Sequence, residues 1–367
     1  MPLTIPLPVP AAPLATKEGW ALHVQRRPID RPDVPAVKEW ERIPEDERRR
    51  FDRMRRAYHA DFGPILTPTL TGLVEDLIDR ALSNMDTRSG ARPGAVMDGP
   101  ANLGKTTILA HFGRRYERLL RREHGDDMQQ AGYSEWHPVV YHSLTPNTSF
   151  KSLCEDITFF YGAPVPRSAN TDALLRTVRR CAQECATTLF LIDDIHYLDV
   201  RHRGAREVNN GLKKLANETS ATFVYAGIDC QHSGLLAGGG ADMDSFGQTR
   251  GRFARLNVEP FRDGDEDWLR LVKAFEEHLV LLKARDGMCV RIADYLHERT
   301  NGYVGALSNL LRLGAAKAVQ NGEERITRRL LESIYIDDAS ETARAVMRKS
   351  RRPGSRSSLG QRPGQTR

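Results

Sequence analysis

Gly99-Pro-Ala-Asn-Leu-Gly-Lys-Thr-Thr107 is the stretch of this sequence that decides the fold. It matches the pattern GxxxxGK[ST]; a short apolar segment ends just before it at Asp98, and an amphipathic pattern begins at Lys105. A strand, a glycine-rich turn and a helix in this order form a loop whose backbone N–H groups face bound phosphates. The residues expected to contact a nucleotide are Gly99, Pro100, Ala101, Asn102, Leu103, Gly104, Lys105, Thr106 and Thr107.

Two side chains of this loop have specific roles in nucleotide chemistry. The lysine of such loops reaches the β- and γ-phosphates of ATP, which assigns that role to Lys105. The hydroxyl group next to it binds Mg²⁺, so Thr106 is the expected metal ligand. ATP and Mg²⁺ are therefore the cofactors that the sequence predicts.

A second segment supports the same interpretation. Leu189-Phe-Leu-Ile-Asp-Asp194 is an apolar run that ends in two adjacent acids. Uncompensated carboxylates are costly at the end of a buried strand, and a solvated turn would explain Asp194 alone better than the pair. We expect Asp193 to hold Mg²⁺ and Asp194 to polarise the attacking water, which makes the protein an ATPase. Most such enzymes have Glu at the second position, and the shorter Asp predicts slow hydrolysis.

Strand and helix patterns alternate from Gly94 onward, and from Gly264 to about Ile336 the pattern is helical only. Alternation of this kind predicts an α/β fold, with a five-stranded parallel sheet between helices and a C-terminal helical lid. The expected strands are Ala95–Asp98, Val139–Leu144, Thr187–Asp194, Thr222–Ile228 and Leu256–Phe261. The expected helices between them are Lys105–His124, Asp172–Ala186 and Glu207–Asn217.

Four regions follow from these patterns. Residues 1–55 form a leader that is Pro-rich and irregular to about residue 35 and then charged and helical. Residues 56–262 form the nucleotide-binding domain, and residues 263–340 form the lid. Residues 341–367 form a basic tail whose Gly, Ser, Pro and Arg content predicts disorder.

The net charge of +6 comes from the end of the chain. Eight basic residues and no acidic residue follow Glu341, so residues 1–341 carry 46 basic and 48 acidic side chains. Binding to nucleic acid must therefore depend on local groups of charges and not on an overall basic domain.

Several classes of protein are excluded by composition. No apolar run approaches the ~18 residues of a membrane span, and the N-terminus lacks the basic region of a secretory signal. The five cysteines show neither CxxC nor Cys/His spacing, so the sequence predicts neither a disulfide framework nor a zinc site. We expect a cytoplasmic protein without a membrane partner.

The assembled motifs resemble those of the AAA+ ATPases, and within them the TniB/TnsC-type transposition ATPases. Besides the loop, the segments that carry the resemblance are His59-Ala-Asp-Phe-Gly63, Leu66-Thr-Pro-Thr69, Ile192-Asp-Asp-Ile-His196, Gly251-Arg-Phe253 and Gly302-Tyr-Val-Gly305. They cover roughly residues 56–335. Gly305, where related ATPases often have a sensor arginine, fits this family, whereas Asp194 departs from its usual Glu.

The resemblance implies an ATP-dependent, DNA-binding regulator of transposition. Such a protein assembles with itself into rings or filaments on duplex DNA, selects target sites and recruits a transposase. In ring-forming ATPases an arginine just before the fifth strand acts on the neighbouring subunit's nucleotide. Arg250, Arg252 and Arg255 are candidates for this arginine finger, and Arg252 is favoured because Phe253 can anchor it. The alternative for all three is a solvated basic segment.

The same resemblance suggests where DNA is bound. The loop after the second strand faces the central channel of such rings, and here it contains Thr148 and Lys151. A hydroxyl group and an ammonium group suit phosphate oxygens and read no bases.

Two other kinds of ATPase remain open as alternatives. A STAND-like signalling switch usually carries an effector or repeat domain after the lid, and a replication initiator or helicase loader usually carries a winged helix there. In this sequence roughly 30 residues follow Ile336, fewer than an independent domain needs. These considerations favour the transposition ATPase.

Overall fold

The protein is described by a computed structural model over residues 12–87, 92–133, 135–146, 148–197, 203–230 and 253–350, with backbone only for 203–209 and 349–350. The chain divides into two compact units. Unit 1 comprises Met1–Asp33 and Ile43–Glu259, and unit 2 comprises Val34–Arg42 and Pro260–Arg367.

Unit 1 is built on one parallel sheet. Its strands are β1 (Gly94–Asp98), β2 (Val139–Ser143), β3 (Leu189–Asp193), β4 (Thr222–Gly227) and β5 (Phe253–Asn257), in the order β2-β3-β4-β1-β5. All four strand pairings are parallel. The first four strands are buried along their whole length apart from Ser143, as expected of a parallel sheet covered on both faces. The predicted five-stranded parallel α/β fold is confirmed.

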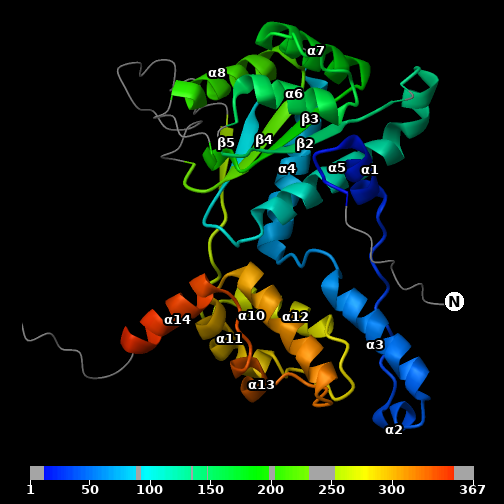
Figure 1. Ribbon diagram of the computed structural model, residues 1–367, viewed down its shortest axis with the longest axis vertical. Helices are drawn as coiled ribbons and strands as arrows, with labels where there is room; N and C mark the ends of the chain where they lie inside the picture. The colour runs from blue at the N-terminus through cyan, green and yellow to red at the C-terminus, as the bar shows by residue number, and fades with distance from the viewer. Residues whose placement is uncertain are drawn as a thin grey trace, which may run out of the picture. The chain divides into compact units, whose positions relative to one another are not determined.

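Helices cover both faces of this sheet (Figure 1). One layer contains α1 (Lys17–Gln25), α4 (Pro68–Asp86) and α5 (Lys105–Gln130), which contact one another through α5. The opposite layer contains α6 (Phe150–Phe160), α7 (Thr171–Glu184) and α8 (Arg203–Glu218). Unit 1 also includes α3 (Glu45–Ala60) and a short 3-10 helix, η1 (Ile195–Tyr197).

Helix α1 corrects the expectation that residues 1 to about 35 are irregular. Thr16 caps it, accepting a hydrogen bond from the N–H of Gly19, and Trp20 is 1% exposed. The indole N–H of Trp20 donates to Glu117 over 2.7 Å. The ring lies over Gly113, where an added Cβ would be 2.9 Å from it. The contact of buried Trp20 with Gly113 therefore holds α1 against α5, although several prolines precede α1.

Two other elements differ from the sequence-based expectation. The fifth strand was predicted at Leu256–Phe261, but β5 ends at Asn257, which is paired with Asp98, the last residue of β1. Phe253 begins this strand and packs edge-on against Tyr225, with ring centroids 5.4 Å apart. Helix α6 was not expected, and it begins at a capping box formed by Ser149 and Ser152.

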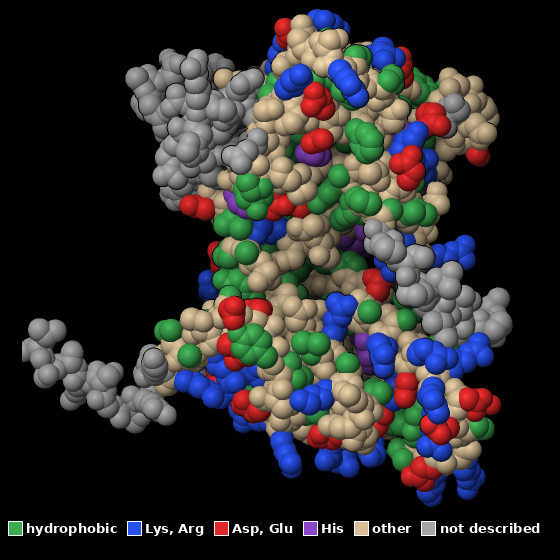
Figure 2. Space-filling model, viewed as in Figure 1, with side chains coloured by type: hydrophobic (Ala, Val, Ile, Leu, Met, Phe, Trp, Pro, Cys, Tyr) green, Lys and Arg blue, Asp and Glu red, His purple; other side chains and the backbone are tan. Residues whose placement is uncertain are grey.

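Unit 2 is helical, as the pattern after Gly264 predicted. Its helices are α2 (Val37–Trp40), α10 (Glu266–Glu277), α11 (Ala293–Thr300), α12 (Val304–Gln320), α13 (Arg328–Glu332) and α14 (Asp338–Ser350), with the 3-10 helix η2 (Val290–Ile292). Buried Arg299 joins three of them, because it donates to the carbonyls of Leu331 and Ile334, each over 2.7 Å, and to Glu341 over 2.9 Å. Lys and Arg side chains are frequent on the face of this unit seen in Figure 2.

Helix α14 corrects the expectation of a disordered tail from residue 341. Arg344 is 7% exposed and donates to Glu332 over 2.6 and 3.0 Å and to Glu298 over 3.3 Å. Arg348 also pairs with Glu298, at 2.9 Å. Two of the basic residues counted as tail charge are therefore neutralised within unit 2.

The described helices include none with the length and apolar character that crossing a membrane requires.

Candidate nucleotide-binding site

The glycine-rich loop lies at the carboxyl end of β1, inside the sheet and not at its edge. Gly99 is required there, since a Cβ would come within 2.1 Å of the carbonyl oxygen of Val258. Gly104 and Asn102 have φ angles of 77° and 60°, in the left-handed region that Gly and Asn tolerate best. The backbone thus makes the close approaches and turns that a phosphate-binding loop needs.

The loop continues into an uncapped helix N-terminus. Gly104 is the N-cap residue of α5, and no side chain of the described residues caps the helix. The first N–H groups of a helix have no intrahelical partner, and the helix dipole adds positive potential at the same place. Thr106 and Thr107 are exposed in this first turn. The turn can therefore offer N–H donors to phosphates and a hydroxyl group to a metal ion.

Lys105 is held at the loop in a buried position. It is 8% exposed, and its Nζ donates to the carbonyl oxygens of Gly99, over 2.8 Å, and of Pro100. Burial lowers the pKa of Lys105, and the nearby carboxylates of Asp193 and Asp98 partly offset that effect. Phosphate oxygens would replace neutral carbonyl partners with charge-assisted hydrogen bonds, which are stronger.

Asp193 is the last residue of β3 and is 2% exposed. Its Oδ1 accepts the N–H of Asp194 at 2.9 Å, and its Oδ2 accepts the hydroxyl of Tyr141 at 3.0 Å. Burial and the charge of Asp193 raise the pKa of Tyr141 far above its usual range, so the phenol remains a neutral donor. The carboxylate is thus fixed in orientation close enough to Lys105 to influence its pKa.

Asp194 follows β3 with a φ of 56°, in the left-handed region. Its Oδ2 accepts a hydrogen bond from the Ser143 hydroxyl at 2.7 Å. Its Oδ1 lies 4.0 Å from Nδ1 of His196, and that nitrogen is buried without a hydrogen-bond partner among the described atoms. Asp194 is therefore tethered to the end of β2 on one side only.

Asp98, the residue before the loop, is a buried anion. Its Oδ2 pairs with Arg255 of β5 at 2.9 Å, and its Oδ1 accepts the N–H of Cys230 at 3.0 Å. The ion pair connects the strand that precedes the loop with the edge strand beside it. Arg255 is thus engaged within its own chain.

The remaining sequence-predicted residues fall into two groups. Arg250 and Arg252 lie outside the described residues. Thr148 is described, and its hydroxyl donates to the carbonyl of Thr145 over 2.7 Å. Lys151, expected in the same loop, lies instead in the first turn of α6, 3.7 Å from Glu155, which balances much of its charge.

Sequence reasoning missed Tyr141, Ser143 and the Asp98–Arg255 pair. The register of β2 on β3 places Ser143 beside Asp193, and no local sequence pattern predicts this pairing. The available signal was a run of polar residues at the end of the second strand.

The donor set fits a magnesium nucleotide. The described residues contain no group of three or more His, Cys, Asp or Glu side chains able to hold a metal by themselves. Mg²⁺ usually binds one or two protein oxygens together with substrate phosphates and water. Thr106 and Asp193 are oxygen ligands of this type.

Comparison with known protein families agrees with this geometry. Residues 66–237 match the family of bacterial TniB proteins. The chain carries a TniB-family domain. No curated protein matches the sequence.

Solved structures show the same fold. The Aeropyrum pernix ORC1 protein in complex with DNA superimposes with a TM-score of 0.52 and 16% identity, covering 79% of this chain and 68% of that one. The ORC2 protein of the same organism, in ADPNP–ADP complexes, gives a TM-score of 0.50 and 14% identity, covering 73% and 68%. These proteins are AAA+ ATPases, and this chain shares their fold.

Proposed function

We propose that this TniB-family protein binds Mg²⁺ and ATP at the loop Gly99–Thr107 and hydrolyses the nucleotide. The observation that carries the proposal is the position of buried Lys105 at an uncapped helix N-terminus, with the fixed carboxylate of Asp193 nearby. A cation, free N–H donors and an anionic oxygen ligand are the groups that a magnesium nucleotide requires.

Each side chain has a separate role in this proposal. ATP supplies the phosphoanhydride bond that is cleaved. Lys105 binds the β- and γ-phosphates, while Thr106 and Asp193 hold Mg²⁺. Asp194 accepts the proton of the attacking water, while its Oδ2 is restrained by the hydrogen bond from Ser143. That restraint, together with its short side chain, supports slow basal hydrolysis.

Arg252 is proposed to complete the site of a neighbouring copy. A finger arginine stabilises negative charge across a subunit interface, so Arg252→Ala should bind ATP but fail to hydrolyse it cooperatively. Mixing this variant with Asp194→Asn should restore part of the activity, because some interfaces then combine one intact arginine with one intact carboxylate. A mixture that co-assembles without any recovery would count against a shared site.

The family match supports a proposal about the biological role. We propose a cytoplasmic regulator of transposition that oligomerises on duplex DNA with ATP and recruits a transposase. The TniB match over residues 66–237 supports this role, and the fold is one found in a protein solved in complex with DNA. Thr148, in the loop after β2, and Lys151, in the first turn of α6, are the proposed phosphate contacts.

The discriminating experiment is ATP turnover by the full chain with and without duplex DNA of mixed sequence. The proposal expects slow turnover alone and faster turnover with DNA, together with ATP-dependent assembly on the DNA by electron microscopy. If the rate of ATP turnover is the same with and without DNA and the protein does not assemble, the result would instead favour a nucleotide-controlled signalling switch. Absence of nucleotide binding would contradict both.

A further inference from the structure

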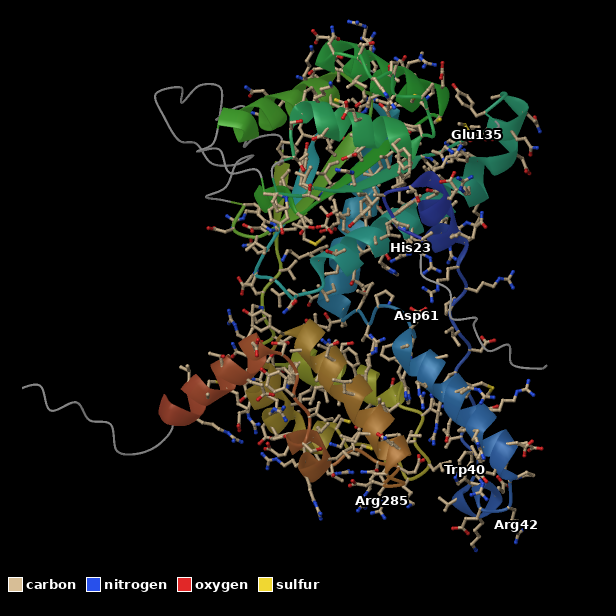
Figure 3. All side chains as sticks on the ribbon, in the orientation of Figure 1. His23, Trp40, Arg42, Asp61, Glu135 and Arg285 are labelled. Atoms are coloured by element: carbon tan, nitrogen blue, oxygen red, sulfur yellow. The ribbon has the colours of Figure 1, made fainter. Side chains whose placement is uncertain are left out.

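Helices α1 and α5 bring several basic side chains together on one face of unit 1. We call Arg26, Arg114, Arg115 and Arg118, with His23 and His111, the arginine cluster. His23 extends from α1 toward α5 (Figure 3), where its Nε2 lies 3.4 Å from the carbonyl oxygen of Ala110. Arg118 donates to the carbonyls of Val24, over 2.7 Å, and of Arg26, over 2.8 Å. Arg114 also donates to the carbonyl of Arg26.

Two of these guanidinium groups have no anionic partner among the described residues. Arg26 pairs with Asp61, and Arg115 pairs with Glu75 at 2.7 Å. In the described part of the chain no carboxylate lies within 4.0 Å of Arg114 or Arg118, and Nε of Arg114 is buried without any hydrogen-bond partner. The cluster therefore keeps an excess of positive charge and spare N–H donors.

The two histidines lie in a partly buried setting beside these arginines. Burial, followed by Arg115 and Arg114, lowers the pKa of His111 to about 4. The pKa of His23 is also lowered, first by burial and then by Arg114, Arg26 and Arg118. Burial is the larger cause of both pKa shifts, and the neighbouring arginines add an effect of the same sign.

Stabilisation of the C-terminal end of α1 explains the orientation of Arg114 and Arg118, because cations suit the last carbonyls of a helix. It does not balance their charge, since a helix terminus carries only about half a negative charge. The start of α6 offers less free positive charge, because Lys151 lies 3.7 Å from Glu155. Over α6 and α7, acidic and basic side chains are interspersed (Figure 2).

We infer that the arginine cluster is a docking surface for the sugar–phosphate backbone of duplex DNA. The inference rests on the DNA binding proposed above and adds a second contact region to it. Guanidinium groups bind phosphate oxygens through paired N–H donors and do so without reading bases. Arg114 lies about 13 Å along the axis of α5 from Lys105, so one rigid helix connects the phosphate loop with this surface.

The test is the salt dependence of binding to a short mixed-sequence duplex, measured by fluorescence anisotropy with the full chain and ATP. Arg118→Gln keeps a hydrogen-bond donor and loses the charge, whereas Arg118→Lys keeps the charge. Arg176→Gln is the matched control, because Arg176 is exposed on α7 in the opposite helical layer. Thermal unfolding of each variant verifies that α1 remains docked.

Arg118→Gln should weaken binding to all sequences and reduce the slope of log K against log[salt] by about one unit. Arg118→Lys and Arg176→Gln should keep the slope of the unmodified chain. If the unmodified chain binds DNA and Arg118→Gln has the same slope, the cluster only clamps α1 and the inference is wrong. If the unmodified chain does not bind DNA with ATP, the proposed function is contradicted as well.

Discussion

The hydroxyl group of Ser143 donates a hydrogen bond to Oδ2 of Asp194 over 2.7 Å, and so joins the end of β2 to the proposed general base. Ser143→Ala should release this carboxylate. We expect ATP turnover without DNA to rise by up to about tenfold, because a hydrogen bond to a charged group contributes ~1.5 kcal/mol. Steady-state phosphate release tests this, with Ser152→Ala in the α6 capping box as a control serine. Slower turnover would mean that Ser143 supports the active orientation of Asp194, and unchanged turnover would mean that the hydrogen bond does not restrain catalysis.

The pair formed by Asp98 and Arg255 predicts a stability effect. The Asp98 side chain is 5% exposed and that of Arg255 is 33% exposed. Arg255→Ala leaves a buried carboxylate without its cation, which should lower the free energy of unfolding by roughly 2–3 kcal/mol. The double variant Arg255→Ala/Asp98→Asn should regain part of that loss in urea titrations. Equal stability of the two variants would show that the Cys230 N–H alone satisfies Asp98.

Stability should fall with acid because of His111. Its pKa of about 4 in the folded chain lies below the ordinary value of 6.5, so the unfolded chain binds the proton first. Stabilisation by neutral His111 is complete above pH 6.5 and is lost as the pH falls toward about 4, on the order of 1–3 kcal/mol. His111→Gln should have a flatter profile of unfolding free energy over that range. Identical profiles would show that His111 is not the group responsible.

Two truncations should separate structure from tail charge. Removing residues 351–367 deletes five arginines and leaves α14 intact. It should weaken DNA binding and flatten its salt dependence while the ATP requirement remains. Ending the chain at Glu341 also removes Arg344 and its ion pairs with Glu298 and Glu332, and should lower the melting temperature. Equal melting temperatures for the two truncated chains would contradict the structural role of α14.

The order of strands and helices along the sequence could be predicted, because each of these elements is marked by a local pattern. The loop at Gly99–Thr107 and the acids after Leu189–Ile192 are short segments whose spacing alone indicates their chemistry. The alternation of strands and helices then restricts the sheet to a parallel arrangement.

The parts that were missed depend on contacts between distant residues. Trp20 fixes α1 only because Gly113 leaves room beneath its ring, and Ser143 meets Asp194 only through the register of β2 on β3. From the sequence, Arg344 is one of several basic residues in the tail, and only the structure shows its ion pairs with Glu298 and Glu332. Such relationships come from packing, and a single sequence does not display them.

The central claim is that the loop Gly99–Thr107 binds ATP, and calorimetric titration of Lys105→Ala with Mg²⁺ and ATP tests it most directly. Lys105 is the loop's only cationic side chain, and its described bonds are to the loop carbonyls of Gly99 and Pro100. The account predicts that the variant folds with an unchanged melting temperature and binds no measurable ATP, while Asp194→Asn binds ATP like the unmodified chain. If Lys105→Ala binds ATP with the same affinity as the unmodified chain, the account is contradicted.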